Sequence, residues 1–244
     1  MRHCASPQLL DEFVGPRNGE YRSALRQGQP VNARSQIEAR FAAAFGRLPL
    51  VAVLRGLVPA QAVDVGQALV DVGWGLLEVP LNSPEPLRSI EALAAAFPEA
   101  LIGAGTVLSA AAVREVHAAG GRMVVAPNFD AKVVGAAVRL GMVALPGVLS
   151  ASEAFAALAA GAIALKLFPA EMIPPAAVRA LRAVLDPQTV LLPVGGITLE
   201  TIEAYRTAGA NGFGVGSSLY RPGDAAGAVG ARARLWAAAF RARP

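Results

Sequence analysis

Lysine is rare in this sequence, and one of its two lysines lies in a strongly apolar segment. The 22 basic residues include only Lys132 and Lys166, and all the others are Arg. Lys166 lies within Ala-Ile-Ala-Leu-Lys-Leu-Phe-Pro, where burial would lower the pKa of its ammonium group. A neutral amine near pH 7 is a nucleophile that can form a Schiff base with a ketone. We therefore expect Lys166 to be catalytic, with a buried ion pair as the alternative, and Lys132 to be solvated.

A glutamate lies in a second apolar segment, Leu-Leu-Glu-Val-Pro-Leu. A strand at this position would direct the side chain of Glu78 into the interior rather than to the surface. A carboxyl group opposite an amine nucleophile could move protons for it. A structural salt bridge to Arg55 or Lys166 is an equally good interpretation of this position.

Short apolar segments alternate with Ala-rich segments of helical pattern from residue 50 onward. The apolar segments are nearly continuous, which is typical of parallel strands covered on both faces. Eight of them start 19 to 28 residues apart, a spacing that fits one strand, one helix and two loops. They comprise residues 50–54, 76–81, 101–107, 123–127, 142–146, 162–168, 190–197 and 212–219.

This alternation of strand and helix patterns predicts an α/β fold, a single (β/α)8 TIM barrel, over residues 46–244. A doubly wound open sheet is the competing fold, but no Gly-x-Gly-x-x-Gly turn follows the first predicted strand. Residues 1–45 are more polar and lack the strand pattern. We expect them to form a partly flexible N-terminal extension that ends in a helix over about residues 35–45.

Two glycine-rich turns follow the seventh and eighth predicted strands, at Gly195-Gly196 and at Gly216-Ser217. Backbone N–H groups in such turns can approach a phosphate closely. Loops at these two positions of a (β/α)8 barrel often bind one. Ordinary tight turns are the alternative. The other polar residues at predicted strand ends include Arg55, Asn82 and Thr106.

The composition argues against several other classes of function. The net charge is +4, but the Arg residues are mostly scattered and only 6% of residues are aromatic, so we expect no nucleic-acid partner. No uncharged segment reaches the roughly 18 residues of a membrane span, and the N-terminus lacks a signal-peptide pattern. We therefore expect a cytoplasmic protein without membrane contact. His3, His117 and Cys4 are the only imidazole and thiol groups, so we expect neither a metal nor a cofactor.

Four motifs in this order resemble a known enzyme family. They are Leu-Glu-Val-Pro-Leu-Asn-Ser-Pro, Ile-Gly-Ala-Gly-Thr-Val-Leu, Leu-Lys-Leu-Phe-Pro-Ala and Val-Gly-Gly-Ile. Together they resemble the class I aldolases of 2-keto-3-deoxy-6-phosphogluconate and 2-keto-3-deoxy-6-phosphogalactonate. The resemblance extends from about residue 48 to the C-terminus.

The resemblance implies a role for each residue at a matching motif position. Lys166 would be the Schiff-base lysine and Glu78 the acid/base. The remaining positions would bind substrate: Thr106 and Phe168 around the pyruvyl half, Arg55 at its carboxylate, and Gly195, Gly196, Gly216 and Ser217 at the phosphate.

Within the family, the sequence is most similar to the galactonate branch, because Pro-Leu-Asn follows Glu-Val where the gluconate branch usually has Thr and Arg. Asn82 is our candidate for the residue that reads the configuration at C4. The resemblance further implies a lyase that needs no cofactor, a phosphorylated 2-keto-3-deoxy sugar acid as substrate, and a homotrimer. The alternatives are the C4-epimeric gluconate aldolase, a non-covalent phosphosugar isomerase and a non-catalytic phosphosugar-binding barrel.

Overall fold

The structure, a computed structural model, describes residues 33–241 of the 244-residue chain. The part of the predicted extension before residue 33 lies outside the described residues. The strands in this region are β1 Leu50–Val53, β2 Leu76–Pro80, β3 Leu101–Gly105, β4 Met123–Val125, β5 Val143–Leu145, β6 Gly147–Val148, β7 Ala164–Leu167, β8 Val190–Pro193 and β9 Phe213–Val215. The helices are α2 Ala33–Arg47, α3 Pro59–Val70, α4 Pro86–Ala96, α5 Ala110–Ala118, α6 Ala131–Arg139, α7 Ala151–Ala159, the 3-10 helix η2 Ala170–Met172, α8 Pro175–Val184, α9 Ile202–Thr207 and α10 Ala226–Arg241.

Several helices begin at residues whose chemistry favours a helix start. The helices α3, α4 and α8 begin at Pro59, Pro86 and Pro175, whose fixed φ suits the first helical position. At α7, Ser150 and Glu153 form a capping box that satisfies free backbone N–H groups. These starts fix where each strand-to-helix loop ends, and those loops carry the candidate site.

The strands form two parallel sheets, so the prediction of one closed eight-stranded (β/α)8 TIM barrel is wrong. Six strands pair in the order β5-β4-β3-β2-β1-β9, and three pair in the order β6-β7-β8. In the larger sheet, Glu78 of β2 lies between Val53 of β1 and Gly103 of β3. In the smaller sheet, Lys166 of β7 lies opposite Gly147 of β6.

The two sheets separate at positions that the hydrophobic pattern does not mark. The fifth predicted strand ends at Pro146, which has no N–H group to donate to a ladder. The chain continues as β6, which pairs with β7 in the smaller sheet. At the other seam, β8 and β9 meet through the isolated parallel bridge between Val194 and Gly214. Within residues 33–241, the ladders therefore do not join into one continuous sheet.

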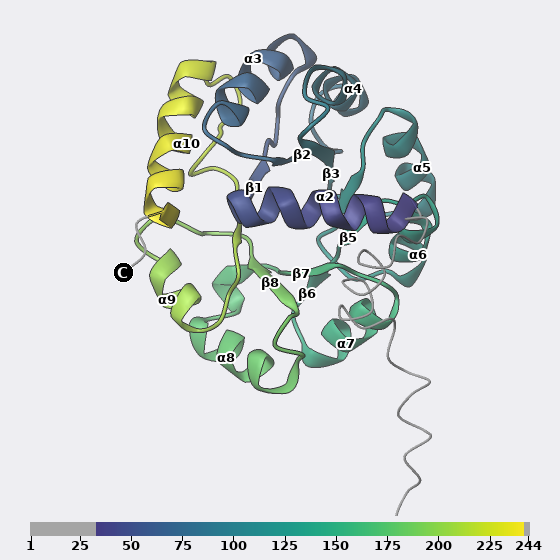
Figure 1. Cartoon of the computed structure of the whole chain (residues 1–244), viewed down its shortest axis with the longest axis vertical. Coiled ribbons are helices and arrows are strands. Elements are labelled where there is room, and N and C mark those ends of the chain that lie inside the picture. The colour runs from purple at the N-terminus through teal and green to yellow at the C-terminus, as the bar shows by residue number, and fades with distance from the viewer. Residues whose placement is uncertain (1–32, 242–244) are drawn as a thin grey trace, which may run out of the picture.

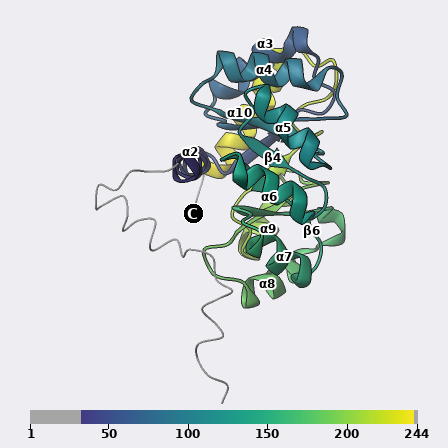
Figure 2. The same ribbon diagram turned by 90° about the vertical axis from the view of Figure 1, so that its right-hand side faces the viewer.

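Helix α2 covers the end of the interior where the strands begin (Figures 1 and 2). Ile37, Phe41 and Ala44 on this helix are buried against strand residues such as Leu76 and Leu101. Arg40 also donates hydrogen bonds to the carbonyl oxygens of Pro98 and Ala100, at 2.6 and 3.2 Å. The polar strand residues of interest therefore lie toward the opposite end, where the strands stop.

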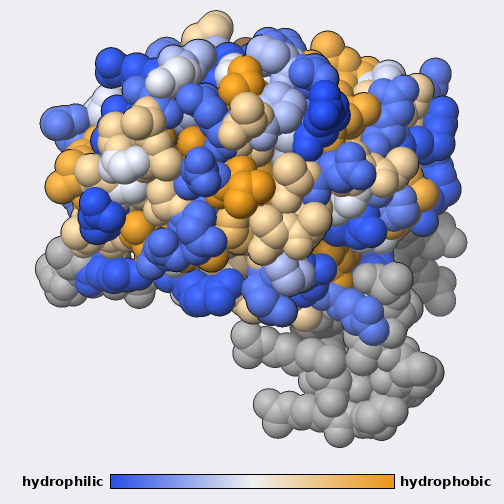
Figure 3. All heavy atoms as spheres, turned by 90° about the horizontal axis from the view of Figure 1, so that it is seen from above, coloured by the Kyte–Doolittle hydropathy of each residue, from blue (hydrophilic) through white to orange (hydrophobic). Residues whose placement is uncertain are grey.

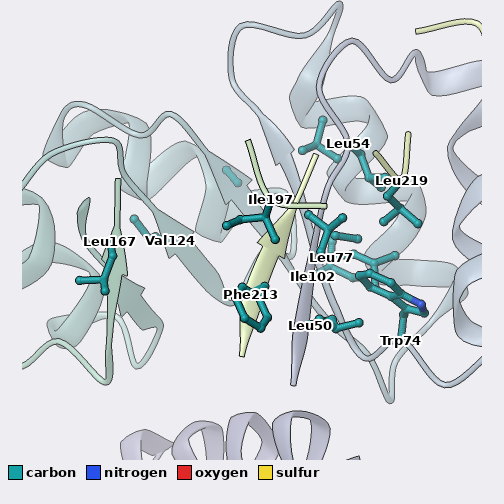
Figure 4. Packing of buried hydrophobic residues seen from close by; sticks show 14 of the residues in the cluster. Leu50, Leu54, Trp74, Leu77, Ile102, Val124, Leu167, Ile197, Phe213 and Leu219 are labelled. Carbon is teal, nitrogen blue, oxygen red and sulfur yellow. The ribbon is translucent and has the colours of Figure 1, made fainter. Parts of the chain in front are cut away.

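A second, larger hydrophobic core lies between the strands and the surrounding helices. Figure 4 shows Trp74 near Leu50 and Leu77 in this layer. The indole N–H of Trp74 donates to the Ala233 carbonyl of α10 at 3.4 Å, so the ring is both buried and partnered. This layer makes the strand framework rigid, which is what a precisely spaced site requires.

The surface carries polar and apolar side chains interspersed, as the face in Figure 3 shows. Among the described helices, none combines the length and the apolar character that crossing a bilayer demands.

Candidate functional site

Lys166 and Glu78 come from different sheets and line one small cavity. Lys166 on β7 is 7% exposed, and Glu78 on β2 is 1% exposed. Their cavity has a volume of about 10 Å³, which is about the room that one water molecule needs. Its other lining residues are apolar: Val51, Val53, Val125, Leu145, Leu192, Val194 and Gly214. Both ionisable groups therefore lie where charge is poorly solvated.

Burial favours the neutral form of the Glu78 carboxyl group. It raises the pKa of Glu78 from 4.5 to about 7, although the positive charges of Lys166 and Arg55 act in the opposite direction. Its Oε2 atom has no hydrogen-bond partner among residues 33–241. A carboxyl group with a pKa near 7 can both accept and donate a proton at neutral pH.

Burial likewise favours the neutral amine of Lys166. Burial lowers the pKa of Lys166. The nearby negative charge of Glu78 partly offsets this lowering, and the positive charge of Arg55 lowers the pKa further. The Nζ atom lies 4.6 Å from the centre of the Phe168 ring. Because Glu78 Oε2 has no polar partner, Lys166 is not held in an ion pair through that oxygen. The amine is thus available as a nucleophile.

The end of β3 packs against the carboxyl group of Glu78. A Cβ atom on residue 105 would overlap Oε2 of Glu78, so any side chain there would force the carboxyl group of Glu78 to move. The next residue, Thr106, has a φ of 56°, in the left-handed region that residues with a side chain rarely adopt. Backbone strain of this kind costs about 1–3 kcal/mol and clusters at functional sites. The sequence indicates Thr106 as a site residue but gives no signal for Gly105, because the close approach joins two strands.

The loops after β1 and β2 are bound to each other beside the cavity. Arg55 donates a hydrogen bond from Nη1 to Oδ1 of Asn82 at 2.7 Å. The N–H group of Gly56 donates to the hydroxyl of the buried Ser83 at 2.9 Å. Asn82 therefore orients the guanidinium whose charge reaches both Lys166 and Glu78. Ser83 lies in the motif Asn-Ser-Pro, and no pattern in the sequence marks it for this contact.

The two glycine-rich turns lie side by side at the ends of β8 and β9. Gly195 and Gly196 both adopt positive φ, at 104° and 61°. The hydroxyl of Ser218 donates to the Ile197 carbonyl at 3.0 Å, which joins the two turns. A Cβ atom on Gly216 would find only Val53 within 4 Å, at 3.9 Å, so there is space beside that turn. The two turns that carry the predicted phosphate residues are thus joined by one hydrogen bond.

A larger open groove of about 640 Å³ lies elsewhere, against the starts of α3 and α4. Its polar residues include Arg88 and Glu85, which form a surface ion pair at 2.8 Å. It contains neither of the buried ionisable groups, so we place the chemistry in the smaller cavity. No group of three or more His, Cys, Asp or Glu residues gathers in a metal-binding arrangement within residues 33–241. His3 and Cys4 lie outside that range.

The fold and the site define an α/β protein with a buried lysine and a buried carboxyl group between two parallel sheets. The chain belongs to the KDPG and KHG aldolase family, whose model matches residues 42–226. The family assignment made from the four sequence motifs is therefore confirmed.

Two named relatives and one solved structure are similar to this chain. The probable 2-dehydro-3-deoxy-6-phosphogalactonate aldolase of Rhizobium meliloti (strain 1021) is 46% identical over 193 residues, covering 79% of this chain and 91% of that protein. The 2-dehydro-3-deoxy-6-phosphogalactonate aldolase of Escherichia coli (strain K12) is 41% identical over 196 residues, covering 80% and 96%. A solved structure described as native KDPGal superposes with a TM-score of 0.78 at 41% identity, covering 80% of this chain and 95% of that one.

Proposed function

We propose that this chain is a class I aldolase that cleaves 2-dehydro-3-deoxy-6-phospho-D-galactonate to pyruvate and D-glyceraldehyde 3-phosphate. The observation that carries the proposal is the shared apolar cavity of Lys166 and Glu78. Burial there favours a nucleophilic amine and a carboxyl group that can exchange a proton near pH 7. Two relatives at 46% and 41% identity carry the name of this activity.

The reaction begins when Nζ of Lys166 attacks the C2 ketone of the substrate. Loss of water leaves a protonated imine, which accepts the electron pair of the C3–C4 bond as that bond breaks. Glu78, directly or through a water molecule, takes the proton of the C4 hydroxyl, and glyceraldehyde 3-phosphate leaves. The enamine is then protonated at C3, and hydrolysis of the imine releases pyruvate and restores the free lysine.

The surrounding residues would hold the substrate in this position. Arg55, oriented by Asn82 at 2.7 Å, would bind the substrate carboxylate. Thr106 and Phe168 would enclose the pyruvyl half. The turns at Gly195-Gly196 and Gly216-Ser217 would bind the phosphate, which keeps C2 near the amine. The chemistry as written needs no cofactor.

The configuration at C4 separates this substrate from its gluconate epimer. Asn82 is our candidate discriminator, because it lies at the end of β2 close to Arg55. A coupled assay with both epimers measures the ratio of kcat/KM, which we expect to favour the galactonate. We also infer from the family resemblance that the protein is a cytoplasmic homotrimer, which analytical ultracentrifugation of the full chain would test.

Borohydride reduction in the presence of pyruvate, followed by peptide mass mapping, tests the covalent mechanism. We expect a stable pyruvyl adduct on Lys166. The exposed Lys132 of α6 serves as an internal control and should stay unmodified. A folded protein that forms no adduct at Lys166 would exclude the class I aldolase and favour an isomerase or a binding protein instead.

A further inference from the structure

The side chain of Glu171 lies against the turn that we assign to the substrate phosphate. The 3-10 helix η2 follows β7, and the N–H group of Ala170 donates to the Val194 carbonyl at 2.9 Å, which fixes η2 beside the end of β8. A Cβ atom on residue 195 would lie 2.6 Å from Oε2 of Glu171. A Cβ atom on residue 196 would lie 2.9 Å from Oε1. One carboxylate oxygen of Glu171 therefore lies on the Cβ side of each glycine of the turn, Oε2 at Gly195 and Oε1 at Gly196.

The charge of this carboxylate is not neutralised by a neighbour. Glu171 makes no hydrogen bond and no ion pair with any residue of the described chain. Its charge acts on Tyr205: burial raises the pKa of that hydroxyl, and the negative charge of Glu171 raises it further. Arg221, which follows the Gly216-Ser217 turn, donates to the Ser217 carbonyl at 3.3 Å and not to Glu171. An uncompensated negative charge thus sits on the proposed anion site.

The position of Glu171 also allows its carboxylate to move away from the Gly195-Gly196 turn. Glu171 is exposed, and only atoms of its flexible side chain, from Cγ outward, approach the turn. Rotation about its side-chain bonds would carry the charge into solvent without moving η2 or the strands. A phosphate dianion that binds the glycine N–H groups would meet the like charge of this carboxylate beside the turn.

We propose that Glu171 is a specificity-determining residue whose carboxylate competes with the substrate phosphate for the Gly195-Gly196 turn. The inference rests on the proposed function, because it takes this turn as the phosphate site. Phosphate binding displaces the carboxylate, which weakens the affinity for phosphorylated ligands and speeds release of the phosphorylated product. The amine chemistry at Lys166 lies apart from this competition and does not depend on it.

The test compares Glu171→Gln with the full-length unmodified protein. Two like charges about 4 Å apart in a well-solvated site repel by roughly 1 kcal/mol, so we expect the inhibition constant of inorganic phosphate to fall about five-fold. The KM of the phosphorylated substrate should fall by a similar factor, with kcat no higher than before. Glu171→Asp keeps the charge but withdraws the oxygens from the turn, and it should give an intermediate value.

Glu200→Gln is the matched control, because it removes the same charge from an exposed position on the loop that follows the turn. It should leave the inhibition constant of phosphate nearly unchanged. Unchanged or weaker phosphate inhibition in Glu171→Gln would overturn the inference. Pyruvate trapping on Lys166 separates this outcome from failure of the proposed function: an adduct without any gain in phosphate affinity overturns the role of Glu171 alone.

Discussion

Replacement of Glu78 by Gln should make the folded protein more stable at alkaline pH while it removes the proton-transfer group. Burial raises the pKa of Glu78 from 4.5 to about 7. A group whose folded-state pKa is raised contributes stability below its unfolded pKa and loses it as the pH rises through the folded pKa. The unmodified protein should therefore lose stability between about pH 4.5 and pH 7. Gln has nearly the same shape and no proton to lose, so Glu78→Gln should escape this loss.

The magnitude follows from the two pKa values. Each unit of difference corresponds to 1.36 kcal/mol, so the shift from 4.5 to about 7 sets an upper limit of about 3 kcal/mol at high pH. At pH 5 only the first part of this loss has occurred. Between pH 5 and pH 8.5, the difference in unfolding free energy should change by about 2–3 kcal/mol in favour of Glu78→Gln. For a chain of this size, that corresponds to roughly 5–10 °C in Tm.

Urea unfolding at pH 5 and pH 8.5 measures this difference, with the protein concentration held constant because assembly adds to apparent stability. Glu115→Gln, an exposed change on α5, is the control and should follow the unmodified protein at both pH values. The same Glu78→Gln protein should lose about 10²-fold or more in kcat. Identical pH slopes for Glu78→Gln and the unmodified protein would refute the reasoning, since the carboxyl group could not then be buried and uncompensated.

Two further substitutions test the geometry of the site. Gly105→Ala places a Cβ atom on Oε2 of Glu78 and should lower kcat about 100-fold. Gly227→Ala is the control, because a Cβ atom there would meet no atom within 4 Å, and its kcat should not change. Equal activity of the two proteins would contradict the tight contact. Asn82→Ala removes the 2.7 Å hydrogen bond that orients Arg55, so the KM for pyruvate in the synthetic direction should rise about ten-fold. Asn128→Ala, at an exposed strand-end position, is the control. An unchanged KM for pyruvate in Asn82→Ala would show that Arg55 does not need the hydrogen bond to Asn82.

The sequence predicted the two central residues because each is unusual where it stands. Lys166 is one of two lysines in an Arg-rich chain, and both Lys166 and Glu78 interrupt apolar segments. The strands of the structure fall within the predicted segments, except that the short β6 follows Pro146 directly. Local composition and periodicity are therefore enough to locate strands and the ionisable groups on them.

Contacts between distant segments could not be predicted in the same way. Whether the strands close into one sheet depends on hydrogen bonds between strands that are distant in sequence. The break after Pro146 and the single bridge at Val194 are set by backbone geometry. The approach of Gly105 to Glu78 and of Glu171 to the Gly195-Gly196 turn joins residues from different loops and strands. A single sequence contains no periodic signal for such pairs, so they appear only once the chain is folded.

Helix α2 has a consequence for the route by which products depart. Ile37, Phe41 and Ala44 fill the interior where the strands begin (Figure 1). Substrate and products must therefore enter and leave at the end where the strands stop. In the proposed reaction, the three-carbon acid stays covalently attached within, while its aldehyde partner lies nearer the entrance. Both products must therefore leave through the end opposite α2, and the acid leaves last because it stays bound to Lys166 until the imine is hydrolysed.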